Sequence, residues 1–286
     1  MILHIKFRRL KMLQIPRMTK SINKKVYIKK ISYSAPFTWL KKGVEDFTKC
    51  PALALFYGTL FTSFTYFYWD FLSHSPTLSD IAAPLLAMVV IIFGPISAMA
   101  MYDASKRLSI GEELSFRSIL TVIKSAFKAN GGSYPSFFLS IILIIIAIMW
   151  MVFTPLIYAI LNTDTFVNQN QTIIEAILDD IINFNNPLFL VIYGIFTTVT
   201  AWISFMISWF SFPMVLDQNI DPFTAAHTSI KTALANKIVM LIWVPIVGII
   251  VLASLLTPYF LGMVVTVPVL AHATWHAYKS LISKLE

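Results

Sequence analysis

Two histidines near the end of the chain, His272 and His276, have a spacing that metal or haem ligation uses. Residues four apart share one face of a helix, so the two imidazoles are expected to point the same way. No Cys, Asp or Glu lies nearby in the sequence to complete a ligand set. His276 also lies near the end of the apolar stretch, where an imidazole can reach water or a backbone carbonyl. A metal- or haem-binding protein is therefore an alternative hypothesis, and the sequence predicts no cofactor.

A second pattern is a stripe of hydroxyl side chains at intervals of 3, 4, 4 and 3 residues, which places them on one helix face. Its members are Thr197, Thr200, Ser204, Ser208 and Ser211. Such a stripe is typical of a close seam between membrane helices, where small residues share hydrogen bonds. A hydrophilic path for a substrate is the alternative. We interpret the stripe as a seam.

Other patterns that would support catalysis are absent from the sequence. There is no nucleotide-binding glycine loop, no Gly-x-Ser-x-Gly elbow and no metalloprotease helix. The five histidines form no evident set with acids, so we predict no catalytic residue. No charge lies in the central part of an apolar stretch, which disfavours a proton-driven pump. Asp103 and Asp217 flank such stretches and are expected to cap helices or pair with Lys106, Arg107 or Lys231.

The elements that position these residues follow from the composition. Of 286 residues, 57% are hydrophobic and only 13% are charged, whereas a soluble domain has about 25% charged residues. Lipid is therefore the expected solvent. The net charge is +8, and thirteen of the 22 Lys and Arg precede residue 50 while the rest lie beside apolar runs. This distribution predicts anchoring to anionic lipid and not nucleic-acid binding. The single cysteine, Cys50, excludes an intrachain disulfide.

Five apolar stretches are long enough to cross a bilayer, and the last can hold two spans. It breaks at Thr257-Pro258, because proline removes a backbone donor and disfavours helix in the preceding residue. The predicted fold class is therefore an all-α membrane protein with six transmembrane helices. The spans cover about residues 51–69, 81–102, 134–161, 187–216, 238–256 and 259–282.

The positions of the basic residues predict the orientation of these spans. If the N-terminus is cytoplasmic, all 22 Lys and Arg lie in inside segments and none in the outside loops, which carry acidic residues. The positive-inside rule then places both termini in the cytoplasm and favours an even number of spans. We predict a multi-pass protein of the bacterial inner membrane.

Amphipathic segments precede the hairpins on the predicted cytoplasmic side. Residues 116–127 and 223–234 agree at five of twelve positions without a gap, and a third copy opens at Phe37. The second begins after Asp221-Pro222, a pattern typical of an N-cap followed by proline. We therefore predict three hairpins, each preceded by a cytoplasmic amphipathic helix, in one domain over residues 35–286. Residues 1–34 are predicted to be a flexible basic arm, whose true start is either Met1 or Met18.

Five short runs of residues carry a resemblance to a known family. They cover residues 35–40, 102–112, 213–217, 233–236 and 272–278, the last reading His-Ala-Thr-Trp-His-Ala-Tyr. Together they resemble the predicted bacterial integral membrane proteins of domain of unknown function 2189, over about residues 30–282. Asp103 stands where the family pattern predicts Glu, and Val44 where it predicts an aromatic residue. The resemblance implies a six-span inner-membrane protein and brings no activity or functional residue.

These observations favour a non-enzymatic membrane protein, either an accessory or assembly factor or a lipid-interacting protein. The expected partners are membrane lipids and other membrane proteins, with no nucleic acid. A small-solute or lipid transporter is the alternative, since kinked spans, repeated hairpins and the hydroxyl stripe fit that class as well.

Overall fold

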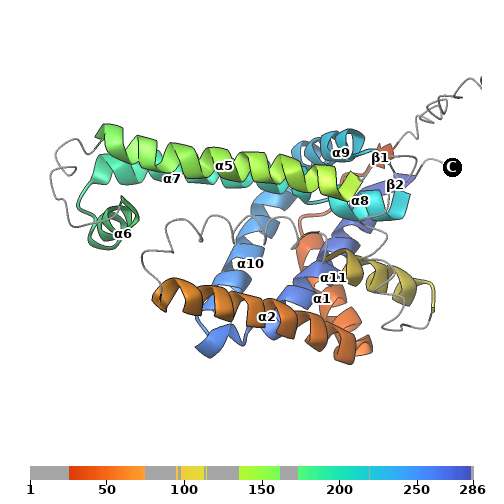
Figure 1. Ribbon diagram of the computed structural model, residues 1–286. Helices are drawn as coiled ribbons and strands as arrows, with labels where there is room; N and C mark the ends of the chain where they lie inside the picture. The colour runs from red at the N-terminus through yellow and green to blue at the C-terminus, as the bar shows by residue number, and fades with distance from the viewer. Residues whose placement is uncertain are drawn as a thin grey trace, which may run out of the picture.

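The computed structural model describes residues 26–74, 95, 98–112, 114, 135–161, 173–218 and 220–284, and these residues are almost all helical (Figure 1). The predicted arm before residue 26, most of the predicted span 81–102 and the segment 116–127 lie outside the described residues. The elements are β1 (Val26–Ile28), α1 (Ala35–Lys49), α2 (Pro51–His74), an unlabelled helical segment over residues 98–109, α5 (Pro135–Leu161), α6 (Ile173–Asn183), α7 (Pro187–Ser208), α8 (Ser211–Gln218), α9 (Pro222–Ala235), α10 (Lys237–Leu255), the short 3-10 turn η2 (Pro258–Phe260), α11 (Met263–Leu281) and β2 (Ile282–Lys284).

Three helical stretches among the described residues are long and apolar enough to cross a membrane. They are Ser136–Leu161, Pro187–Gln218 and Lys237–Leu255, which coincide with the third, fourth and fifth predicted spans. Helices α2 and α11 occupy the first and sixth predicted spans but do not belong to this set. The architecture is therefore helical with three candidate spans in the described part of the chain. The six-span count stays a prediction.

The long helices form two layers with a connecting pair between them (Figure 1). Helices α5 and α7 lie side by side along one edge, and α2 runs along the opposite edge. Helices α10 and α11 lie between them, with α11 packed against both α1 and α2. The core of buried side chains concentrates where α1, α11, α8 and the 98–109 segment meet, and it includes Trp39, Trp243, Trp275 and Tyr278.

The predicted break at Thr257-Pro258 is present. Helix α10 ends at Leu255, η2 begins at Pro258, and α11 begins at Met263. The Thr257 hydroxyl donates to the Ser254 carbonyl at 2.7 Å and accepts the Gly262 amide at 2.7 Å, so it replaces two helical hydrogen bonds across the turn.

The predicted span 187–216 is not one straight helix, because it divides into α7 and α8 at Trp209-Phe210. The Ser229 hydroxyl of α9 accepts the Phe210 amide at 3.1 Å and donates to the Met206 carbonyl at 2.7 Å. These are the two backbone groups that would otherwise bond each other in a continuous helix. A side chain inserted into the hydrogen-bond ladder is a recognised cause of a kink, and sequence periodicity does not report it.

Two of the predicted amphipathic helices lie in the described residues, α1 before α2 and α9 before α10. Helix α1 packs its apolar face directly on α11, where Trp39 is buried and its indole donates to Ser280 at 2.9 Å. Strands β1 and β2 pair antiparallel with Ile28 opposite Ile282. The region around this sheet, with α8, α9 and the starts of α1 and α10, is called the sheet end below.

Candidate functional site

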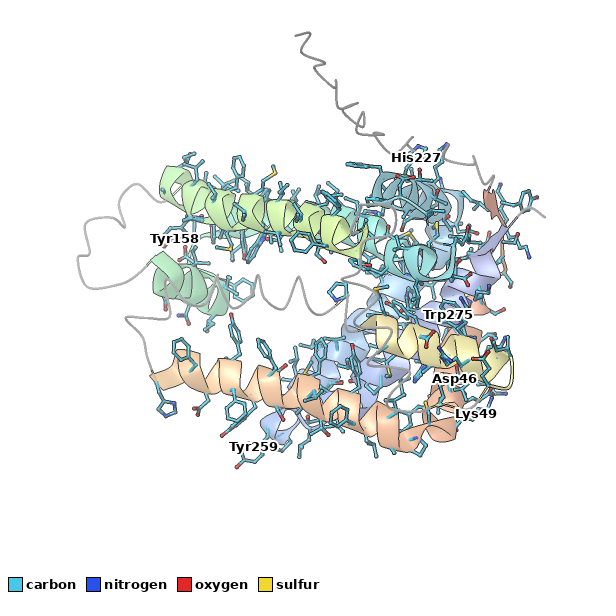
Figure 2. The ribbon with its side chains drawn as sticks, turned by 45° about the vertical axis from the view of Figure 1, so that its right-hand side comes forward. Asp46, Lys49, Tyr158, His227, Tyr259 and Trp275 are labelled. Carbon is cyan, nitrogen blue, oxygen red and sulfur yellow. The ribbon has the colours of Figure 1, made fainter. Side chains whose placement is uncertain are left out.

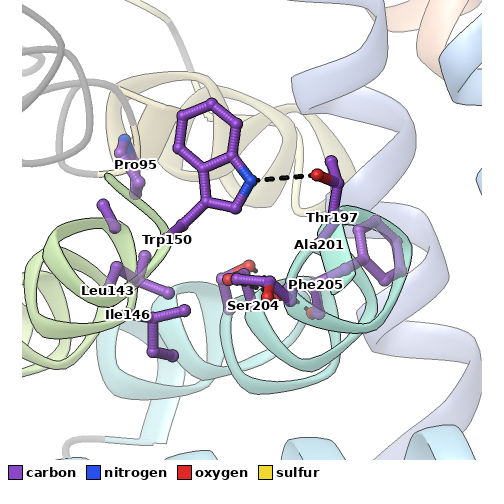
Figure 3. Close-up of a pocket in the computed structure, with 11 residues that line it drawn as sticks. Pro95, Leu143, Ile146, Trp150, Thr197, Ala201, Ser204 and Phe205 are labelled. Atoms are coloured by element: carbon purple, nitrogen blue, oxygen red, sulfur yellow. Dashed lines mark hydrogen bonds between the residues drawn. The ribbon is translucent and has the colours of Figure 1, made fainter. Parts of the chain in front are cut away.

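The hydroxyl stripe lies on a groove between α5 and α7 with a volume of about 500 Å³ (Figure 3). Thr197, Thr200, Ser204 and Ser208 all line it, together with apolar residues that include Leu143, Ile146 and Phe205. Ser211 is the exception, because it lies beyond the kink in α8 and is fully buried there. The structure thus brings four of the five predicted stripe residues to one cavity.

The hydroxyls in the groove are already hydrogen-bonded within the protein. Thr200 donates to the Phe196 carbonyl at 2.8 Å, and Ser204 donates to the Thr200 carbonyl at 2.9 Å. One bond crosses between the helices, from the Trp150 indole of α5 to the Thr197 hydroxyl at 3.1 Å (Figure 3). The predicted seam therefore has one shared bond, and the remaining lining is suited to an apolar ligand with a few polar contacts.

A second cavity of about 270 Å³ adjoins the groove and shares Pro95, Phe205 and Ser208 with it. It extends between α2, α11 and the 98–109 segment, where Tyr57, Tyr102 and Thr274 contribute to its wall. The two cavities thus lie on either side of these shared residues, one between α5 and α7 and the other towards α2 and α11.

The two predicted histidines of α11 have different partners, which lie at the C-terminal end of α1 and on the 98–109 segment. His272 is completely buried, with its Nδ1 2.7 Å from the Ser105 hydroxyl and its Nε2 3.8 Å from the Cys50 sulfur. His276 Nε2 lies 2.7 Å from a carboxylate oxygen of Asp46. The described residues contain no group of three or more His, Cys, Asp or Glu arranged to hold a metal ion. The two imidazoles were predicted to share a helix face, but they contact different side chains and have no partner in common in the part of the chain that the structure describes.

Burial and hydrogen bonding set the ionisation of this cluster. Burial by itself raises the pKa of Asp46, but hydrogen bonds from His276 and Ser105 and the nearby imidazoles bring that pKa below its usual value of 3.8. Burial and the Asp46 charge raise the pKa of the Cys50 thiol to about 11. The thiol is therefore protonated at neutral pH and is a poor nucleophile. The cluster joins α1, α11 and the 98–109 segment by bonds among polar side chains.

Two further carboxylates at the sheet end are held by cations. Asp217 lies 3.0 Å from the Lys106 ammonium and 3.2 Å from the Lys279 ammonium, and it accepts the Tyr278 hydroxyl at 2.8 Å. Asp103 lies 2.6 Å from the Arg107 guanidinium. The prediction that these aspartates pair with Lys106 and Arg107 is confirmed. Sequence reasoning did not single out Asp46 or Ser105, because their histidine partners are more than 160 residues away and no local spacing reports them.

The comparison with known families adds one result. The model of the family described as predicted integral membrane protein (domain of unknown function 2189) matches residues 82–217. The chain is an integral membrane protein. The resemblance inferred from the sequence is confirmed over that range, whereas the His272–Tyr278 run lies outside the match. No curated protein and no solved structure matches the chain.

Proposed function

We propose that this protein is a lipid-interacting, non-enzymatic protein of the bacterial inner membrane that holds an apolar chain in the groove between α5 and α7. The groove is the single observation that carries the proposal. Its volume of about 500 Å³ lies within the range of about 300–1,000 Å³ usual for ligand sites, and its lining is mainly apolar. It lies between two of the candidate spans, Ser136–Leu161 and Pro187–Gln218, where lipid chains are the most abundant ligand.

The pairing of these polar residues supports a role without catalysis. Asp46, Asp103 and Asp217 each have a cationic or imidazole partner within 3.0 Å. His272 is completely buried, so substrate has no direct access to it. A general acid or base must reach the reacting atoms, and these groups instead hold helices together.

The inside placement of both termini is part of the proposal. Strands β1 and β2 pair, so Val26 and Lys284 lie on the same side of the molecule. That arrangement supports an even number of crossings between them. Lys29 and Lys30 follow β1, and Lys231 and Lys237 lie on α9 and at the start of α10, whereas Asp179 and Asp180 lie on α6 at the far end of the α5–α7 pair (Figure 1). This polarity is the one expected for a cytoplasmic sheet end.

Lipid analysis of purified variants tests the groove. Ala201 lines the groove, so Ala201→Trp should fill it and lower the amount of lipid that copurifies in mild detergent. Val199→Trp is the matched control, because Val199 is on the same helix, is exposed and does not line the groove. Equal lipid retention by wild type and Ala201→Trp, with both variants folded, would show that the groove holds no chain.

A transporter is the second candidate, and the presence of Thr200 and Ser204 in the groove favours it. Replacing both with Leu removes the hydroxyls and keeps the apolar lining. If the groove conducts a solute or a lipid headgroup, the Thr200→Leu, Ser204→Leu variant should lose flux in proteoliposomes. If the groove only holds an acyl chain, this variant should retain lipid as wild type does.

The accessory or assembly role concerns partners beyond lipid. Affinity purification of the full chain in mild detergent, followed by mass spectrometry, should return at least one other membrane protein in stoichiometric amount. Recovery of the protein with lipid alone would leave lipid binding as its function and would remove the assembly role.

A further inference from the structure

Four lysines gather where the chain after β1 meets the junction of α9 and α10. This basic corner consists of Lys29, Lys30, Lys231 and Lys237, and all four are exposed. The side chain of Asn236 holds the corner together. Its amide nitrogen donates to the Lys29 carbonyl at 3.0 Å, and its oxygen accepts the Ile31 amide at 3.3 Å. The segment that carries Lys29 and Lys30 is thereby fixed next to Asn236, with Lys237 directly after Asn236 in the chain and Lys231 five residues before it.

Nearby carboxylates do not neutralise these lysines. Asp217 pairs with Lys106 and Lys279, and Asp103 pairs with Arg107, so the acids of the sheet end are engaged elsewhere. Asp221 caps the far end of α9 by accepting the Thr224 amide at 2.8 Å. Within the described part of the chain, no carboxylate lies within 4.0 Å of an ammonium of the basic corner.

The surroundings of the corner are typical of a site at the depth of lipid headgroups. Lys237 is the first residue of the candidate span Lys237–Leu255, and the exposed apolar residues Ile238 and Leu241 lie within the next turn of the helix. On α9, one exposed stripe carries Phe223, His227, Lys231 and Leu234, with His227 on the outer side of the molecule (Figure 2). Basic and apolar side chains on one face are typical of a helix at the membrane interface.

We propose that the basic corner is a binding site for the headgroup of an anionic phospholipid. Four clustered ammonium groups attract a phosphodiester, and the apolar residues beside them contact the upper part of the acyl chains. The site lies on the outer face of α9 and α10 and does not include the groove between α5 and α7. It therefore goes beyond the proposed function. The leaflet it faces follows from the proposed orientation.

The test compares two triple variants with the same change in net charge. Lys30→Gln, Lys231→Gln, Lys237→Gln removes most of the corner. Lys41→Gln, Lys42→Gln, Lys49→Gln removes three exposed lysines of α1, where the acidic Glu45 and Asp46 lie close in the sequence. Each full-length protein is reconstituted in vesicles of phosphatidylcholine with a minor fraction of phosphatidylglycerol in both leaflets. It is then re-extracted in mild detergent, and the retained lipid is measured by mass spectrometry.

Wild type and the α1 variant should retain phosphatidylglycerol in preference to phosphatidylcholine, and the corner variant should lose most of that preference. One lysine near a charged surface contributes about a fivefold factor, so Lys237→Gln alone should lower the retained ratio by about that much. Equal preference in all proteins, or equal loss in both triple variants, would overturn the proposal. Where the triple variant does not fold, the three single substitutions carry the same comparison. Ala201→Trp should keep the preference, so failure here is distinguishable from failure of the groove.

Discussion

The contact between Gly58 of α2 and the backbone of α11 gives the sharpest prediction of stability. A Cβ placed on Gly58 would lie 1.9 Å from the Val264 carbonyl oxygen, whereas ordinary contact begins near 3.4 Å. The obstruction is backbone and not a flexible side chain, so α2 and α11 must separate by about 1.5 Å to admit the methyl group. Small residues allow such close crossings of membrane helices. Overpacking of this kind costs about 1–3 kcal/mol, and a rigid backbone places Gly58→Ala at the upper end.

This effect is measured by thermal unfolding of the purified protein in detergent, which is monitored by size-exclusion chromatography at a fixed heating rate. Gly58→Ala should lower the apparent Tm by several degrees, since about 1 kcal/mol corresponds to about 2–4 °C in a chain of 150–250 residues. Gly194→Ala and Gly248→Ala are controls, because a Cβ there meets no described atom within 4 Å. They should leave Tm unchanged or raise it slightly, since alanine favours helix. A Tm for Gly58→Ala equal to that of the controls would refute the close crossing of α2 and α11.

Three further predictions concern ionisable groups outside the spans. The folded-state pKa of Asp46 is depressed, so its contribution to stability is present above its ordinary pKa of 3.8 and is lost as pH falls through the folded value. The Asp46→Asn variant should therefore be less stable than wild type at pH 7, by about 1–3 kcal/mol. In pH-dependent unfolding, this variant should also show a weaker acid transition. Asp221→Ala removes the N-cap of α9 and should cost about 1 kcal/mol, while Asp221→Asn should cost much less, as unfolding of the two variants would reveal. The buried Cys50 thiol, with its pKa raised to about 11, should resist iodoacetamide at neutral pH in the folded protein and react after denaturation in SDS; rapid labelling of the folded protein would contradict its burial.

Features with a local cause were predictable from the sequence. Proline and its preceding residue determine the break at Thr257-Pro258, and α9 begins after its Asp221 cap. The 3, 4, 4, 3 spacing also located four of the residues that line the groove, although spacing alone did not reveal a cavity. In each case the interacting residues lie within one helix or one turn.

Features that depend on distant partners were not predictable. Strands β1 and β2 have three residues each, which is too short for a period to be recognised, and they form only because their partner is present. The kink at Phe210 depends on a hydroxyl from another helix. The need for a glycine at position 58 likewise depends on the close approach of the α11 backbone. The fully buried His272 shows the same limit, since its partner Ser105 lies 167 residues earlier.

The pairing of β1 with β2, and of α1 with α11, constrains the order in which the protein is assembled during synthesis. The first described elements pair with the last described ones, so the apolar face of α1 that carries Trp39 stays uncovered until α11 has left the ribosome and been inserted. Closure of the sheet end is therefore a late event, because it requires that α11 and β2 have been synthesised. A nascent chain that stops before residue 263 lacks α11 and β2, and it exposes at one end the surface of α1 that a chaperone or membrane protease can recognise.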